Sequence, residues 1–457
     1  MSNLKFSESG VRGVIGETLT PKLLAALALA FGRYVGGGTV AVGRDTRHSG
    51  IMAERAVVAG LLAAGCKPIL LGITPTPTVE FMVRQLHAHG GIAITASHNP
   101  AHWNALKLIG ERGVFLNRNE ARELFDLYNQ GSDRCVPEGL LHRVGEFQDA
   151  FALHQKHIFA HIDVEAIRNC HFKVAIDCCD GVGSVTSVGF LQDLGCEVIP
   201  LFTGTDGIFH RPPEPIAENL TLLRETVVKK QCAIGFAHDP DGDRMALIDN
   251  TGRALGTDAT LMLPIAHILA REPSPIVVNC QSSMALKDIA EDFGVPFFYS
   301  KVGEINVVEK MIACGAEIGG EGSSAGLIWR KVNPARDAYV VMGLMLEMMA
   351  CNSGKTVAEL FDALPHYHYV AAKVEASPCA AREAIIHLAQ LYAKENVTRI
   401  DGVRVDFSES WFLVRQSNTE RVLRVNAEAK NLQRAEELLK TVLNEIQPII
   451  DHYDRNY

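Results

Sequence analysis

Three short apolar runs near the start of the chain decide its fold class: TVAVG (39–43), KPILLG (67–72) and GIAI (91–94), the last of which continues into TASHNP (95–100). A stretch with helical spacing follows each of the first two runs, over Met52 to Ala64 and Thr76 to His87. Alternation of short β-branched runs with helical stretches is typical of βαβ units. We therefore expect a mainly parallel α/β sheet that is buried on both faces.

The same alternation recurs twice before the pattern changes. FKVAID (172–177) and AIGFA (233–237) belong to a second cycle, and PIVVNC (275–280) opens a third. The final segment instead alternates apolar and polar positions, as half-buried antiparallel strands do, and ends in a helix predicted over Asn431 to Ile446. The sequence therefore predicts three related mixed-sheet α/β domains and a small C-terminal α+β domain. The predicted bounds are 1–148, 149–254, 255–368 and 369–457.

The composition of the 457 residues excludes several classes of protein. No apolar run reaches the roughly 18 to 20 residues that a membrane-spanning helix needs, so no membrane partner is expected. Lys and Arg number 44 against 53 Asp and Glu, and there is no basic tract, so no nucleic-acid partner is expected either. The eleven cysteines contain no CxxC pair and the first residues are unlike a signal peptide, which predicts a reduced, cytoplasmic protein.

The loop TASHNP places a serine directly after a predicted strand. Ser97 stands at the carboxyl end of GIAI, and open α/β sheets bind their ligands at that edge. Asn99 and Pro100 turn the chain so that the Ser97 hydroxyl projects from it. The alternative is a capped turn, in which Ser97 satisfies the first N–H groups of a helix.

A second loop, HDPDGDR (238–244), lies between the predicted strands AIGFA and MALID (245–249). Its carboxylates, Asp239, Asp241 and Asp243, can converge on a hard cation such as Mg²⁺, with Gly242 letting the backbone fold inward. The loop is no EF-hand, because glycine separates the second and third aspartates and a strand follows at once. A solvated acidic turn is the alternative, although three idle carboxylates would repel one another. A phosphorylated Ser97 would suit the same cation, since Mg²⁺ commonly pairs carboxylates with phosphate oxygens.

Two further polar loops follow. GGEGSSAG (319–326) offers Glu321, Ser323 and Ser324 to a polyhydroxylated ligand such as a sugar, or is a flexible hairpin. RQSNTE (415–420) lies between two strands of the last domain and offers a guanidinium, hydroxyls and an amide to a phosphate, or is a polar hairpin.

In this order, the four loops resemble the signature loops of the α-D-phosphohexomutase superfamily, and FSESGVRG (6–13) is similar to the family's opening segment. The resemblance covers the whole chain. It implies a heart-shaped molecule with a central cleft, to which the four domains contribute a phosphoserine loop, a metal-binding loop, a sugar-binding loop and a phosphate-binding loop in turn.

The resemblance also implies a role for individual residues. Ser97 would carry a phosphoryl group, and the Mg²⁺ ligands would be Ser97, Asp239, Asp241 and Asp243. Near the transferred group would lie His98, Lys107 and Arg244, with Arg12 as a further phosphate contact. Sugar hydroxyls would be held by Glu321, Ser323 and Ser324, and the phosphate that is not transferred by Arg415, Ser417, Asn418 and Thr419.

The implied reaction interconverts hexose 1-phosphate and hexose 6-phosphate, of mannose or glucose, through a phosphoserine enzyme and a hexose 1,6-bisphosphate, which also serves as activator. A small-molecule phosphosugar is thus the expected partner, and a monomer or homodimer the expected state. Phosphoglucosamine mutase is the first alternative. A metal-dependent sugar phosphatase with an aspartate nucleophile and a non-catalytic sugar-phosphate-binding protein of the same fold are the others.

Three segments depart from the family pattern. Ala325 stands where many relatives carry a histidine that is a candidate base. Arg421 replaces a usual proline after Thr419-Glu420, and Ser7-Glu8 replaces Gly-Thr in the opening segment. The sequence therefore leaves the general base unassigned.

Overall fold

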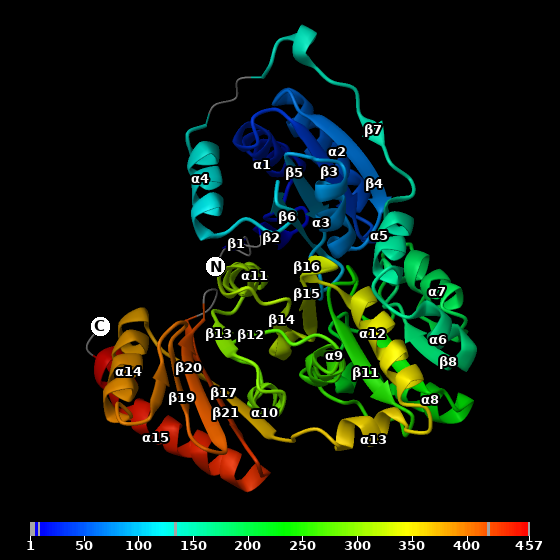
Figure 1. Ribbon diagram of the computed structural model, residues 1–457. Helices are drawn as coiled ribbons and strands as arrows, with labels where there is room; N and C mark the ends of the chain where they lie inside the picture. Colours follow the sequence, from blue (N-terminus) through cyan, green and yellow to red (C-terminus); the bar gives the residue numbers. More distant parts are fainter. Residues whose placement is uncertain (1–4, 8–9, 132–134, 418–420, 456–457) are drawn as a thin grey trace. The chain divides into compact units, whose positions relative to one another are not determined.

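The computed structural model describes residues 5–7, 10–131, 135–417 and 421–455 (Figure 1). The chain divides into two compact units, residues 1–267 with 324–361 and residues 268–323 with 362–457. Among the described residues, no helix combines the length and apolar character needed to cross a membrane. The four domain bounds expected from the sequence stay predictions.

The first sheet of unit 1 has seven strands in the order β1-β2-β6-β5-β3-β4-β7. They are β1 (Lys5–Ser7), β2 (Gly10–Val14), β3 (Thr39–Arg44), β4 (Lys67–Ile73), β5 (Gly90–Ile94), β6 (Trp103–Gly110) and β7 (Gly145–Glu146). β5, β3, β4 and β7 are parallel, whereas β6, β2 and β1 are antiparallel to their neighbours. The sheet is therefore mixed rather than mainly parallel, because residues 95–102 alone link β5 to β6 and are too few for a crossover.

Four helices cover this sheet: α1 (Pro21–Tyr34), α2 (Gly50–Ala63), α3 (Thr76–Gln85) and α4 (Arg118–Asn129). α1 packs on both α2 and α4, and buries Leu24 and Phe31 in their shared core. The chain runs from β3 through α2 to β4, then through α3 to β5 on the other side of β3. The strand order reverses there, so the loops after β3 and β5 lie where α/β sheets bind ligands.

The second sheet of unit 1 has the order β11-β10-β8-β9. Its strands are β8 (Lys173–Asp177), β9 (Glu197–Leu201), β10 (Ile234–His238) and β11 (Met245–Asp249). The helices α7 (Gly183–Asp193) and α8 (Thr221–Lys230) pack on these strands. Helices α5 (Ala150–Phe159) and α6 (Val164–Cys170) precede the sheet in the chain, the turn η1 (Glu138–Leu140) precedes β7 of the first sheet, and the turn η2 (Ala217–Asn219) precedes α8. β10 and β11 form an antiparallel hairpin. The DPDGDR loop is the turn of this hairpin, as the sequence predicts.

The remaining elements of unit 1 include a hairpin of β15 (Gly326–Trp329) and β16 (Asn333–Arg336), and the buried helix α12 (Ala338–Cys351). Asp337 begins α12, because its side chain accepts hydrogen bonds from the N–H groups of Tyr339 and Val340. Helices α9 (Ala259–Leu269) and α13 (Val357–Asp362) cross from one unit into the other.

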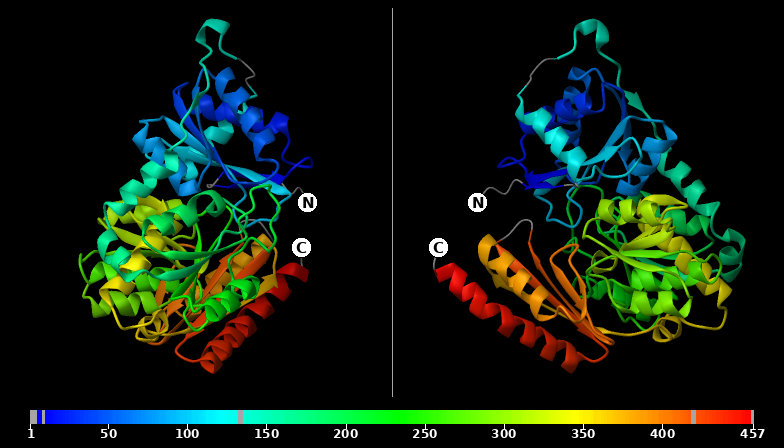
Figure 2. Two further views of the ribbon diagram at one scale, coloured as in Figure 1. Left: turned by 90° about the vertical axis from the view of Figure 1, so that its right-hand side faces the viewer. Right: turned by 60° about the vertical axis from the view of Figure 1, so that its left-hand side comes forward.

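Unit 2 contains parallel strands and an antiparallel sheet. β12 (Ile276–Asn279), β13 (Phe297–Ser300) and β14 (Ile318–Glu321) are parallel and alternate with α10 (Ala285–Asp292) and α11 (Glu304–Cys314), and the turn η3 (Gly322–Ser324) follows. The antiparallel sheet has the order β17-β21-β20-β19-β18, with β17 (His368–Glu375), β18 (Asn396–Thr398), β19 (Val403–Asp406), β20 (Ser410–Gln416) and β21 (Val422–Ala429). Figure 2 shows α14 (Pro378–Leu391) and α15 (Leu432–Arg455) together on one face of this sheet.

The C-terminal helix is longer than the sequence predicts. The expected end was Ile446, but α15 continues to Arg455 and contains Pro448. Proline removes one helical N–H donor and usually ends a helix. Here Ile450 and Tyr453 extend the apolar stripe onto the sheet core, so their burial offsets the missing hydrogen bond.

Candidate active site

The loop after β5 brings Ser97 to the DPDGDR loop. The Oγ atom of Ser97 donates a hydrogen bond to Oδ2 of Asp239 at 2.6 Å, across 142 residues of chain. Ser97 is buried and its backbone is left-handed, with φ of +50°. A non-glycine residue in that region carries strain of about 1–3 kcal/mol, which commonly marks a functional turn. Two of the four predicted loops therefore meet at Ser97 and Asp239.

A buried arginine holds the Ser97 loop in this shape. Arg47 lies in the loop after β3 and is 1% exposed. Its guanidinium donates to four carbonyl oxygens, those of Ser97 (2.6 Å), Asn99 (2.7 Å), Pro100 (2.6 Å) and Trp103 (3.0 Å), and to Oδ2 of Asp45 (2.9 Å). These bonds compensate the strained turn and fix the direction of the Ser97 hydroxyl.

Asp239, Asp241 and Asp243 converge in the hairpin turn. One carboxylate oxygen from each lies within 4.8 Å of the others, and all three side chains are buried. Gly242 turns the chain with φ of +70°, as expected for the inward fold. Burial, followed by the charges of Asp241 and Asp243, raises the pKa of Asp239 well above its usual value. A cation would relieve this mutual repulsion.

One carboxylate oxygen of Asp241 and one of Asp243 are available to a metal cation. Among the residues that the structure describes, the Oδ1 atoms of Asp241 and Asp243 are buried and accept no hydrogen bond. Buried carboxylate oxygens without a partner are costly unless a metal or a donor uses them. Hard oxygen ligands of this kind suit Mg²⁺ or Ca²⁺, so the residues present fit a divalent metal.

The Oδ2 atoms of the same two aspartates have partners from other elements. Lys107, on β6, donates to Oδ2 of Asp241 at 2.6 Å and of Asp243 at 2.7 Å. Thr76, at the start of α3, donates to Oδ2 of Asp241 at 2.7 Å, and Arg336, at the end of β16, to that of Asp243 at 2.8 Å. Burial alone would lower the pKa of Lys107, but the two carboxylates raise it above its usual value.

Three further groups gather near the Ser97 loop. Arg12, on β2, donates to Oδ1 of Asn99 at 2.6 Å. The pKa of Arg12 is lowered by burial and then by the charge of Arg244. His98 has its Nδ1 3.4 Å from Oγ of Ser97, and its pKa is lowered to about 2, first by Arg244 and then by burial and Arg12. Guanidinium groups that disfavour further positive charge in this way mark a place where an anion would be stabilised.

The sugar loop in unit 2 is held by its neighbours. Glu321, at the end of β14, is buried, and its Oε1 accepts from Nδ2 of Asn279 at 3.0 Å and from the N–H of Gly303 at 2.7 Å. Asn279 is the last residue of β12, so the carboxyl ends of two neighbouring parallel strands fix the Glu321 side chain. Ser323 belongs to the turn η3, and its side chain lies outside the described residues.

The end of the sugar loop belongs to unit 1. Ser324 accepts a hydrogen bond at Oγ from Nη1 of Arg336 at 3.3 Å. Ala325 takes a left-handed φ of +53°, and its carbonyl accepts from the N–H of Met245 at 3.1 Å. Ala325 thus joins the β15 hairpin to β11, and it offers no side chain for proton transfer.

The phosphate loop follows β20 in unit 2. Arg415 is 8% exposed, and its Nη1 lies 3.5 Å from Oδ2 of Asp401. Asp401 Oδ2 also accepts from the N–H of Val302, next to the Gly303 that holds Glu321. Ser417 is buried and its N–H donates to the carbonyl of Val422 at 2.9 Å. The predicted residues Asn418 and Thr419 lie outside the described residues. Asp401 thus links the two loops of unit 2.

Sequence reasoning missed several of these residues. Arg47 and Asp45 follow strand β3 as Ser97 follows β5, so their position after a strand was a usable signal. Thr76 follows the parallel strand β4 in the same way. Arg336 and Asp401 carried no such signal, because their roles depend on contacts between distant elements.

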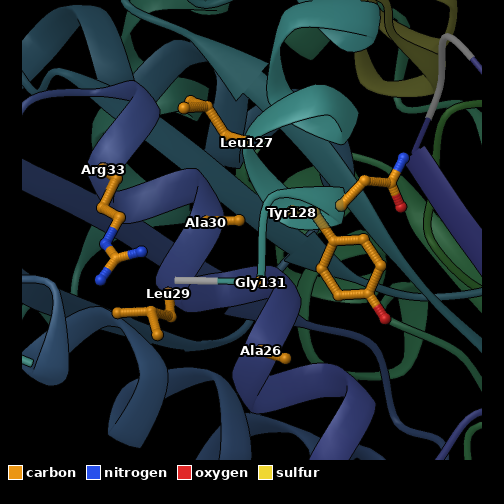
Figure 3. A pocket seen from close by; sticks show the side chains of 8 residues that line it. Ala26, Leu29, Ala30, Arg33, Leu127, Tyr128 and Gly131 are labelled. Carbon is orange, nitrogen blue, oxygen red and sulfur yellow. The ribbon is translucent and has the colours of Figure 1, made fainter. Parts of the chain in front are cut away.

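A separate pocket lies elsewhere in unit 1. It measures about 370 Å³ and is lined by residues of α1 and α4, among them Leu29, Arg33 and Tyr128 (Figure 3). None of the residues predicted for catalysis, metal or substrate lines it. The pocket is therefore not the candidate active site.

A buried serine hydroxyl that donates to one of three converging aspartates, on α/β domains, is typical of phosphotransferases. Comparisons with known proteins agree. The four domain models described as phosphoglucomutase/phosphomannomutase α/β/α domains I, II and III and C-terminal domain match residues 3–134, 152–252, 257–367 and 370–445. The chain belongs to the phosphoglucomutase/phosphomannomutase family.

Individual relatives are similar along their whole length. A phosphoglucosamine/phosphogalactosamine mutase of Sulfurisphaera tokodaii is 32% identical over 98% of this chain and 99% of that protein. A phosphoglucomutase/phosphomannomutase of Thermococcus kodakarensis is 34% identical over 95% of this chain and 96% of its own length. A solved phosphoglucomutase/phosphomannomutase family protein of Burkholderia thailandensis is 25% identical, covers 97% of this chain and 99% of its own, and superposes with a TM-score of 0.84. The predicted superfamily, the four-domain α/β architecture and an isomerase of the phosphohexomutase type are confirmed.

Proposed function

We propose that the protein interconverts the 1-phosphate and 6-phosphate of glucose or mannose through phosphorylated Ser97 and a hexose 1,6-bisphosphate. The hydrogen bond between Ser97 Oγ and Asp239 carries this proposal, because it brings a hydroxyl nucleophile to the candidate metal ligands. The substrate is a small phosphosugar, and its bisphosphate also activates the enzyme by phosphorylating Ser97. A cytoplasmic location and a monomeric or homodimeric state stay predictions.

Ser97, Asp239, Asp241 and Asp243 would hold Mg²⁺. The support is that Oδ1 of Asp241 and Oδ1 of Asp243 accept no hydrogen bond from the described residues, although Nε of Arg244 lies 3.9 Å from Oδ1 of Asp243. When bound, the ion neutralises charge on the transferred phosphoryl group and so stabilises the transition state. Arg12, His98, Lys107 and Arg244 surround the same group in the proposal. The charges of Arg12, Lys107 and Arg244 would favour a phosphoserine, which is an anion in a buried place, whereas the imidazole of His98 is neutral.

The proposed reaction has two transfers at one serine. First the bond between phosphorus and Oγ of Ser97 breaks, the hydroxyl of the substrate forms a new bond to phosphorus, and the hydroxyl proton ends on Oγ. In the structure Oγ of Ser97 lies 2.6 Å from Oδ2 of Asp239, so the carboxylate would accept a hydrogen bond from that hydroxyl. After the bisphosphate reorients, Oγ takes the other phosphoryl group and returns the proton to the leaving sugar oxygen.

The sugar loop and the phosphate loop would hold the rest of the substrate. Glu321, Ser323 and Ser324 would bind hydroxyls, and Arg415, Ser417, Asn418 and Thr419 the phosphate that is not transferred. The buried guanidinium of Arg415 supports this, since arginine binds phosphate through paired N–H groups. Binding the remote phosphate fixes the reacting hydroxyl in line with phosphorus.

Glucosamine phosphate is the second candidate substrate, because the relative from Sulfurisphaera tokodaii carries that activity in its name. We expect turnover of glucose, mannose or glucosamine 1-phosphate in the presence of Mg²⁺ and a trace of the matching bisphosphate. The ratio of kcat/KM values among the three decides the preferred sugar. No turnover of any of them, with no phosphate on Ser97 by intact mass, would favour the non-catalytic alternative.

Asp401 offers a test of the proposed phosphate loop. We expect Asp401→Ala to raise KM for the phosphosugar about tenfold, because it removes an acceptor that orients Arg415, and hydrogen bonds to charged groups contribute about 1.5–3 kcal/mol. The matched control is Asp288→Ala, which removes another partly buried acid of unit 2 that pairs with Lys430 at 3.1 Å. Steady-state kinetics measure both. Equal KM values for the two variants would contradict the role of Asp401.

A further inference from the structure

Side chains around the metal loop hydrogen-bond one carboxylate oxygen of Asp241 and one of Asp243. The other oxygen of each of these two side chains stays available to a cation. Thr76 and Lys107 occupy Oδ2 of Asp241, and Lys107 and Arg336 occupy Oδ2 of Asp243. The two Oδ1 atoms accept no hydrogen bond from any described residue. The hydrogen bonds from Thr76 and Arg336 therefore orient the carboxylates of Asp241 and Asp243 relative to a bound cation.

Thr76 and Arg336 come from different elements that share one buried cluster. Thr78, two residues after Thr76, has its Oγ1 3.0 Å from Nδ1 of His154. Asp337, the residue after Arg336, has its Oδ2 3.0 Å from Nε2 of the same ring. One imidazole thus spans the start of α3 and the start of α12.

Asn333 closes the cluster on its other side. Its Nδ2 donates to the carbonyl of Pro77 at 3.1 Å and to Oδ2 of Asp337 at 3.2 Å, and its Oδ1 accepts from Nη2 of Arg84 at 2.7 Å. Two of these three bonds join α3 to the segment that carries Arg336. Side chains that do not touch the metal loop therefore help to hold the spacing between Thr76 and Arg336, alongside the backbone bond from the N–H of Thr76 to the carbonyl of Asp241 at 3.0 Å.

His154 is closely packed within this cluster. It lies on α5, is fully buried, and stacks on Phe81 with ring centroids 4.8 Å apart and planes 22° apart. Packing fixes the ring plane, Nδ1 is hydrogen-bonded to Thr78, and Nε2 makes a close contact with Asp337 that lacks hydrogen-bond geometry. When a buried side chain is held in this way, a shift of one of its neighbours also shifts the others.

We propose that His154 is a positioning residue for the metal site. It acts through Thr78 and Asp337 on the hydrogen bonds that Thr76 and Arg336 donate to the aspartates. The inference rests on the proposed metal site, but it concerns residues outside the four signature loops. Residues that orient metal ligands from a distance typically change metal affinity by about 10–100-fold when they are replaced. Replacement of His154 should therefore weaken Mg²⁺ binding while contacts to the sugar stay intact.

The test compares Mg²⁺ binding by wild type, His154→Phe and Thr78→Val, each as purified and freed of metal by EDTA and dialysis. Phenylalanine keeps the stack on Phe81 but has neither nitrogen, and valine removes only the Oγ1 partner. Isothermal titration should show Kd raised at least tenfold in His154→Phe and less in Thr78→Val. KM for the phosphosugar at saturating Mg²⁺ should not change.

The matched control is His267→Phe, which breaks another buried histidine–carboxylate pair of unit 1, with His267 Nε2 2.9 Å from Oε2 of Glu347. It should lose stability without losing Mg²⁺ affinity. If the wild type binds Mg²⁺ and both His154→Phe and Thr78→Val bind it with unchanged affinity, the inference is overturned but the proposed metal site is not. If His154→Phe does not fold, the result for Thr78→Val decides. Absence of Mg²⁺ binding by wild type would overturn the proposed metal site and the inference with it.

Discussion

Replacing Ser97 with alanine is expected to lower mutase turnover by about four orders of magnitude or more, as removal of a covalent nucleophile does in other enzymes. The Oγ atom of Ser97 is the only atom of that side chain that can carry the phosphoryl group, and alanine has no equivalent. The variant should also lack the bound phosphate that intact mass detects on the wild type. Conversion of hexose 1-phosphate to hexose 6-phosphate, with bisphosphate and Mg²⁺ present, measures the loss.

The outcome also separates the proposed mutase from the phosphatase alternative. Ser274→Ala is the matched control, because Ser274 is another buried serine, whose Oγ donates to the carbonyl of Pro275. Its turnover should equal that of the wild type. Full phosphate release by Ser97→Ala without isomerisation would instead support an aspartate nucleophile in the DPDGDR loop. Unchanged isomerisation would place the reaction at another residue.

The parts of the site that follow strands could be predicted from the sequence. Ser97 and Asp239 each come directly after an apolar run, and the structure puts those runs in β5 and β10. Strand ends collect ligand-binding loops at one edge of a sheet, so position after a strand carries information about function. Their direct contact, by contrast, rests on the packing of two sheets, which no local pattern encodes.

Two residues that act across elements and belong to none of the four loops could not be predicted. Arg336 grips Asp243 across 93 residues, and His154 acts on the metal loop only through two further side chains. Each is one polar residue in a stretch whose periodicity reports its own helix or strand and nothing beyond it. The end of α15 was also predicted too early, at Ile446. Pro448 is a strong local stop signal, but tertiary packing overrides it and the helix continues to Arg455.

Lys107→Met is expected to destabilise the metal-free protein by about 3–5 kcal/mol, the usual cost of leaving a buried ion pair with one partner. The Nζ atom of Lys107 lies 2.6 Å and 2.7 Å from the carboxylates of Asp241 and Asp243, and its side chain is 3% exposed. Methionine fills the volume but leaves two buried negative charges facing each other. Urea unfolding in EDTA measures the loss.

Mg²⁺ should restore much of the lost stability, because a cation bound only to the folded chain stabilises it by about 2.7 kcal/mol at a concentration one hundred times Kd. The matched control is Lys173→Met, which breaks the exposed pair of Lys173 with Glu197 at 2.9 Å and should cost less than about 1 kcal/mol, with or without Mg²⁺. If Lys107→Met loses no more stability in EDTA than this control does, the carboxylates of Asp241 and Asp243 do not depend on Lys107 to balance their charge. If it is destabilised but Mg²⁺ brings no recovery, the trio is a structural ion-pair cluster rather than a metal site, because a divalent ion is the stronger partner for three carboxylates.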